Sequence, residues 1–237
     1  MMKTICKTVD RHVSFIIVEL DPAYHQAAFN LGFTPTDDGL ERSFSAAAPH
    51  LERIYRNFER YAEEMIMQTA KVHPVPWEQA LLAFLSATTN QSIDWWLVGS
   101  AALAVRGVDI VPQDLDIATD GAGAQRLGEL LLDFLVEPVD NCQDWISDWW
   151  GRAFLHARLE WVGDVHENID QPNVTDFGPV AASRLDIVKW HGKEIRVPPI
   201  DLQLQVSEQR GLNERVEKIK DFLSRSETRS ESLIFCL

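Results

Sequence analysis

The sequence predicts an α+β protein in which a βα and helical N-terminal region precedes a small mixed sheet flanked by helices. Residues 13–20 (VSFIIVEL) form an apolar run with the length of a strand. Residues 50–71 repeat apolar side chains at spacings of three and four, which is the period of an amphipathic helix. Residues 95–120 then read as strand, turn, short helix and second strand.

The N-terminal region is expected to begin with a small βαβ or βα unit. The apolar run is followed by a helix-like stretch that begins at Asp21-Pro22 and stops at Gly32, and then by the turn-rich segment TPTDDG. HPVP at residues 73–76 ends the long helix, because proline removes amide donors and biases the residue before it toward extended geometry. We therefore expect an N-terminal region at 1–76, a second domain at 77–225 and a polar tail at 226–237.

The second domain is expected to alternate helices and short strands. The ranges are a helix at 77–89, a strand at 93–98, a helix at 101–106 ending at Gly107, a strand at 114–119, a helix at 122–135, one long strand at 154–165, a strand pair around Gly192, and a terminal helix from residue 200.

Composition and charge narrow the function classes. The chain has 237 residues, 46% of them hydrophobic, which is enough for a sizeable core. Its formal net charge of -14 opposes a polyanion, so nucleic acid is a poor partner, whereas a small cation is attracted.

The spacing of the cysteines and the length of the apolar run indicate the cellular compartment. Cys6, Cys142 and Cys236 show no zinc or disulfide spacing, which fits a reducing cytoplasm. The apolar run at 13–20 is too short for a membrane span, so no membrane partner is expected.

The turn at Gly99-Ser100 is suited to phosphate. It follows a predicted strand and opens a predicted helix. Gly99 lets the backbone approach a ligand closely, and Ser100 offers a hydroxyl together with a helix N-terminal amide.

The segment Asp114-Leu115-Asp116-Ile117 is suited to a metal ion. Residues two apart on a strand share a face, so the two carboxylates point together while the apolar pair points into the core. Like charges on one face repel unless a cation lies between them, and Mg²⁺ prefers such oxygen ligands. A third carboxylate is expected from Glu160, with Asp164 on the same strand face as the alternative.

These residues resemble the motif of the nucleotidyltransferase superfamily related to DNA polymerase beta: a hydrophobic residue, Gly, Gly or Ser, a spacer, then Asp-hydrophobic-Asp/Glu-hydrophobic. Here it reads Val98-Gly99-Ser100 and then residues 114–117. The resemblance covers about residues 77–222, and many members have Asp where this chain offers Glu160. It implies that Gly99 and Ser100 contact nucleotide phosphates, that Asp114 and Asp116 bind metal, and that Glu160 completes the set as base or ligand.

The closing segment, residues 192–219, is similar to that of small bacterial members related to aminoglycoside nucleotidyltransferases. The candidate triphosphate contacts in and just before this segment are Lys189, Lys193, Arg196 and Arg210. His156, beside the strand of Glu160, is an ordinary polar residue rather than a general base.

The sequence thus predicts a Mg²⁺-dependent enzyme that transfers a nucleoside monophosphate from a nucleoside triphosphate, ATP foremost, to a hydroxyl of a small and cationic acceptor. Acidic residues within 140–148 are expected to hold amines, and Trp145 or Trp149 to cover a sugar face. Two alternatives stay open: a nucleotide-binding regulatory or toxin-antitoxin-type module without turnover, and a nucleotidyltransferase acting on transfer RNA or protein. Acceptor identity, base preference and oligomeric state are not predicted.

Overall fold

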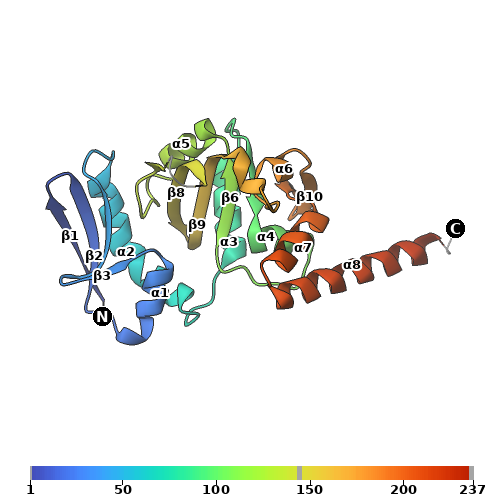
Figure 1. Cartoon of the computed structure of the whole chain (residues 1–237), viewed down its shortest axis with the longest axis horizontal. Helices are drawn as coiled ribbons and strands as arrows, with labels where there is room; N and C mark the ends of the chain where they lie inside the picture. Colours follow the sequence, from blue (N-terminus) through green and yellow to red (C-terminus); the bar gives the residue numbers. More distant parts are fainter. Residues whose placement is uncertain (1, 143–145, 235–237) are drawn as a thin grey trace.

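The computed structural model describes residues 2–142 and 146–234, and it places two sheets side by side along the chain (Figure 1). The N-terminal sheet has the order β1-β2-β4-β3 and contains β1 (Lys3–Val9), β2 (His12–Val18), β3 (Thr34–Thr36) and β4 (Gly39–Ser45). Between β2 and β3 lie η1 (Pro22–Tyr24) and α1 (His25–Asn30). The helix α2 (Leu51–Thr69) packs Ile54 and Phe58 into the same hydrophobic core as Phe15 of β2.

Of the two units expected here, the βα unit is present as β2 followed by η1 and α1, whereas a βαβ unit with parallel strands is not, because each neighbouring pair in this sheet is antiparallel. No range was predicted from the sequence for β1, whose side chains are almost all exposed and therefore form no apolar run, nor for β3 and β4. The segment TPTDDG forms β3 and the turn into β4. The long helix predicted at 50–71 is confirmed by α2.

The second sheet is mixed, as predicted, with the order β5-β6-β9-β8-β7. Its strands are β5 (Trp95–Val98), β6 (Leu115–Thr119), β7 (Asp140–Asn141), β8 (Ser147–Leu155) and β9 (Ala157–Val165). The pair β6-β9 is parallel, and β5-β6, β8-β9 and β7-β8 are antiparallel. The helices α3 (Trp77–Thr88) and α5 (Gly121–Leu130) pack on one face, and α4 (Gly99–Arg106) connects β5 to β6.

The remaining elements follow the second sheet. They are η2 (Glu167–Asp170), α6 (Pro179–Ala182), the hairpin of β10 (Asp186–Trp190) and β11 (Lys193–Val197), α7 (Ile200–Gln209) and α8 (Asn213–Ile234). The hairpin confirms the strand pair predicted around Gly192.

Three predicted boundaries are corrected. The long strand at 154–165 is two strands that meet at His156, which has a φ of 62°. The helix predicted to reach residue 135 ends at Leu130. The terminal helix breaks at Gly211, which has a φ of 66°, and its second half continues through residue 234, so it includes residues 226–234 of the expected polar tail.

The core continues across residue 76. Buried residues of β2, α2, α3, β6 and β9 belong to one hydrophobic cluster. The Asn57 amide of α2 also donates to the carbonyls of Leu132 and Leu135, each at 3.0 Å. The helix α2 is therefore packed against the second sheet, and the N-terminal sheet shares the same core. Among the residues that the structure describes, no helix has both the length and the apolar character needed to cross a membrane.

Candidate functional site

Three carboxylates converge on the face of the second sheet that lies away from α3 and α5. Asp116 of β6 lies opposite Glu160 of β9 in the parallel register, and Asp114 directly precedes β6. Asp114, Asp116 and Glu160 each offer an oxygen that lies within 4.8 Å of the other two. Leu115 and Ile117 are 0% and 1% exposed on the opposite face, as the alternation of a strand requires.

The turn at Gly99 adjoins Asp116. Val98 of β5 pairs with Asp116 across the sheet, so α4 begins beside the carboxylates. Gly99 has a φ of 63°, and a Cβ at this position would lie only 2.8 Å from Asp116 Oδ2. Both facts require glycine. Ser100 is the second residue of α4 and is half-buried.

Two arginines form ion pairs with two of the three carboxylates, those of Asp114 and Glu160. Arg158 forms an ion pair with Asp114 and places its Nε 3.4 Å from Glu160 Oε1. Arg152 Nε donates to the same Glu160 oxygen at 2.6 Å. Burial alone would raise the pKa of Glu160, but the attraction of Arg152 and Arg158 outweighs it and lowers that pKa. Glu160 is therefore a carboxylate kept charged, which suits a metal ligand better than a base.

Asp116 has no such partner. Within residues 2–142 and 146–234, no group donates a hydrogen bond to its carboxylate or forms a salt bridge with it. Burial and the neighbouring Asp114 and Glu160 raise the pKa of Asp116 well above its ordinary value. A half-buried carboxylate without a donor among the described residues, next to two others, fits a divalent cation with oxygen ligands. The donor set thus fits Mg²⁺.

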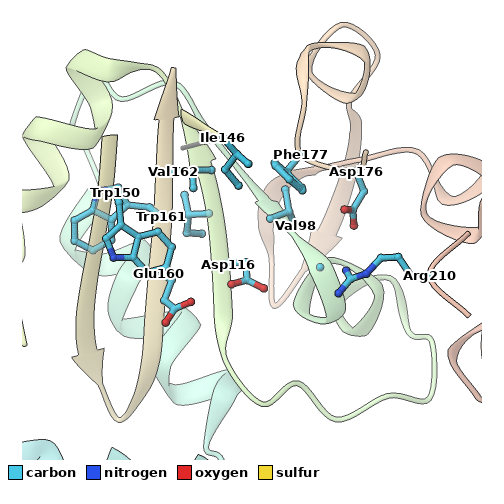
Figure 2. A pocket seen from close by; sticks show the side chains of 12 residues that line it. Val98, Asp116, Ile146, Trp150, Glu160, Trp161, Val162, Asp176, Phe177 and Arg210 are labelled. Atoms are coloured by element: carbon cyan, nitrogen blue, oxygen red, sulfur yellow. The ribbon is translucent and has the colours of Figure 1, made fainter. Parts of the chain in front are cut away.

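A cavity of about 190 Å³ opens beside these groups (Figure 2). Gly99, Asp116 and Glu160 contribute its polar side, and its apolar wall carries the side chains of Val98, Ile146, Trp150, Val162 and Phe177. Asp176 and Arg210 lie at the end nearest α4 and α7. The cavity therefore joins a candidate metal site to a surface that can pack against a ring.

Asp176 and Arg215 were missed by the sequence reasoning. Asp176 is 7% exposed, and its nearest hydrogen-bond donor is Gln203 Nε2 at 3.4 Å. Arg215 is half-buried, so desolvation lowers its pKa, while Asp176, Asp116 and Asp114 attract its charge. Neither belongs to a local motif, because the loop before α6 and the start of α8 reach the site only through the tertiary fold.

The other candidates lie elsewhere. Asp164, the alternative third carboxylate, accepts a hydrogen bond from Gly121 N at 2.7 Å at the start of α5. Lys189 and Lys193 are exposed on the β10-β11 hairpin and do not line the cavity. Arg196 pairs with Asp94 at 2.5 Å. Of the four predicted basic contacts, Arg210 lines the cavity, and Lys189, Lys193 and Arg196 do not.

The structure separates Trp149, which was expected beside the acceptor, from the cavity. Trp149 packs against the core on the helix-covered face, whereas Trp150 lines the cavity. The alternation along a strand separated the two rings as expected, but the sequence could not say which face each one occupies. Trp145 lies outside the described residues.

Comparison with known proteins gives partial structural likenesses. No protein-family model matches the sequence, and no curated protein matches it. A proposed nucleotidyltransferase of Thermotoga maritima is similar over 63% of this chain and 93% of its own, with 22% identity and a TM-score of 0.48. A lincosamide antibiotic adenylyltransferase bound to lincomycin is similar over 60% and 96%, with 13% identity and a TM-score of 0.44. The antibiotic-resistance factor ANT(2'')-Ia is similar over 67% and 98%, with 14% identity and a TM-score of 0.38.

Proposed function

We propose that this chain is a Mg²⁺-dependent nucleotidyltransferase that transfers a nucleoside monophosphate from a nucleoside triphosphate, ATP foremost, to a hydroxyl of a small cationic acceptor in the cytoplasm. One observation carries the proposal. The oxygens of Asp114, Asp116 and Glu160 lie within 4.8 Å of one another, directly beside the Gly99 turn. Phosphoryl chemistry needs a cation site and an anion-binding backbone turn that face the same group.

Each residue has a role in this reaction. Asp114, Asp116 and Glu160 would hold the metal, which when bound supplies a Lewis acid for the phosphoryl oxygens. Gly99 and Ser100 would place backbone amides against the phosphates, and Arg210 lies at the same end of the cavity. The acceptor hydroxyl gives its proton to water and its oxygen forms a bond to the α-phosphorus, while the bond from that phosphorus to the bridging oxygen breaks and pyrophosphate leaves.

The acceptor side is supported by charge and by the apolar wall. The net charge of -14 opposes a nucleic acid and draws in a cation. Ile146 and Trp150, which flank the acidic Asp148, line the cavity. An aromatic ring beside carboxylates suits a hydroxylated amine, since the ring packs on its apolar face and the carboxylates pair with its ammonium groups.

The test is incubation of the protein with each labelled nucleoside triphosphate, Mg²⁺ and a panel of acceptors that includes aminoglycosides, other hydroxylated amines and transfer RNA. Pyrophosphate and labelled acceptor are measured together. The proposal expects both products with a small amine, none after chelation of the metal, and none from the variant Asp116→Asn. Lys189→Met is the matched control, because Lys189 lies outside the cavity and its loss leaves the reaction unchanged.

Other results would reassign the protein. Nucleotide binding without pyrophosphate release would favour the regulatory module. Labelled transfer RNA, with binding that falls steeply as salt rises, would favour the alternative that modifies RNA.

A further inference from the structure

A chain of buried ion pairs leads from Glu160 to the N-terminal sheet. Arg152 of β8 lies opposite Glu160 in the antiparallel register and donates to its Oε1 at 2.6 Å. The same guanidinium pairs with Glu137, whose other carboxylate oxygen lies 2.6 Å from Arg42 of β4. Arg152 and Glu137 are 5% and 3% exposed. A candidate metal ligand is thus connected, through two buried side chains, to a residue about 120 positions earlier in the chain.

The carbonyl oxygen of Leu31 fixes the far end of this chain. Arg152 Nη1 donates to it at 2.8 Å, and Arg42 Nη1 donates to it at 2.9 Å. Two guanidinium groups this close repel each other, and the buried carboxylate of Glu137 between them offsets that repulsion. Gly32 makes the room, because a Cβ there would lie 1.9 Å from Arg42 Nη1.

The two oxygens of Glu160 have different surroundings. Oε1 faces Arg152 at 2.6 Å and Arg158 at 3.4 Å. Oε2 has no hydrogen-bond donor among the residues that the structure describes. Holding one oxygen of a carboxylate fixes the direction of the other, which is how partners outside the ligand shell set metal affinity.

We propose that Arg152 is a positioning residue for Glu160, and that the N-terminal sheet braces it through Arg42 and the Leu31 carbonyl. This inference rests on the proposed function, because it takes Glu160 as a metal ligand. It assigns a role to the N-terminal region, which carries none of the three carboxylates. A purely structural ion-pair chain would change the stability of the fold and leave the metal affinity of the folded protein unaltered.

The experiment measures Mn²⁺ affinity without nucleotide, by titration followed with electron paramagnetic resonance, in the full chain. The test variants are Arg42→Met and Arg152→Lys. Arg53→Met is the matched control. Arg53 also joins the N-terminal region to the second domain, but through an exposed ion pair with Asp133. Thermal unfolding of each variant shows that it is folded.

We expect Arg42→Met and Arg152→Lys to weaken Mn²⁺ binding about tenfold, the lower end of the range for partners outside the ligand shell. Arg53→Met should bind as the wild type does. A folded Arg42→Met variant with wild-type affinity overturns the inference, and if that variant does not fold, the same result for Arg152→Lys overturns it.

The wild-type arm separates this failure from failure of the proposed function. If the wild type binds Mn²⁺ and releases pyrophosphate, and Arg42→Met binds Mn²⁺ with the wild-type affinity, only the inference fails. If the wild type binds no Mn²⁺, both the inference and the proposed function fail.

Discussion

Replacing Asp116 by asparagine should stabilise the metal-free protein while removing its metal site. The carboxylates of Asp114 and Glu160 each offer an oxygen within 4.8 Å of Asp116. Two unit charges at that distance repel by about 3 kcal/mol at an effective dielectric constant of about 20. Arg158 and Arg152 neutralise part of the neighbouring charge, so we expect a net gain of about 1–3 kcal/mol from the variant.

The assay is thermal unfolding in the presence of a chelator. For a domain of this size, each kcal/mol shifts the melting temperature by about 2–4 °C, so Asp116→Asn should melt at least about 2 °C higher than the wild type. Added Mn²⁺ should then raise the melting temperature of the wild type and not that of the variant, because only the wild type binds the ion. Asp201→Asn, which removes an exposed carboxylate paired with Arg184, is the control and should change little.

The stability gain should depend on pH with a definite sign. Burial and the two neighbouring carboxylates raise the pKa of Asp116 above its ordinary value of 3.8. At pH values below 3.8, Asp116 is protonated in both the folded and the unfolded chain, so it does not lower the stability of the fold through charge repulsion. As the pH rises from there through the folded-state pKa, the wild type loses stability and the variant does not. The advantage of Asp116→Asn should therefore grow with pH. A variant that instead melts several degrees lower with chelator at every pH would refute the like-charge reasoning and show that Asp116 is structural.

Two further substitutions test the turn and the basic contact. Gly99→Ala should weaken Mn²⁺ binding about tenfold or more, because the new methyl group strains a residue with positive φ and displaces Asp116; wild-type affinity measured by the same titration would contradict this. Arg210→Met should raise KM for the nucleoside triphosphate about tenfold, because one charge-assisted contact is lost, while Lys189→Met should leave that KM unchanged. Steady-state kinetics in which Lys189→Met raises KM more than Arg210→Met does would contradict the placement of the phosphates.

The centre of the candidate site was predictable because its residues are local in sequence. Asp114 and Asp116 are two apart on one strand, so the period of a strand alone places them on one face. Gly99 follows the strand that pairs with theirs. Glu160 required one further assumption, that its strand is a neighbour of β6, and the parallel register confirms it.

The rest could not be predicted, for two physical reasons. Periodicity says which side chains share a face, but not which face meets the core, so the sequence could not say whether Trp149 or Trp150 faces the cavity. His156 takes a turn conformation that is rare outside glycine, so no turn signal interrupts the apolar pattern at the β8-β9 hairpin.

The ion-pair chain was beyond sequence reasoning altogether. Arg42, Glu137 and Arg152 meet only after two sheets pack together, and no local pattern marks a residue that acts at such a separation.

The local charge explains how an acidic protein can hold an anionic nucleotide. The guanidinium groups of Arg42, Arg152 and Arg158 face four carboxylates, those of Asp114, Asp116, Glu137 and Glu160. Within this set the carboxylates outnumber the arginines by one, so a bound divalent cation reverses the sign of its net charge and strengthens its attraction for phosphate. Nucleotide binding should thus depend on the metal, whereas a cationic acceptor is drawn in by the surface charge with or without it. The two substrates would then differ in their response to a chelator, which removes the nucleotide and leaves the acceptor bound, whereas salt weakens the binding of both.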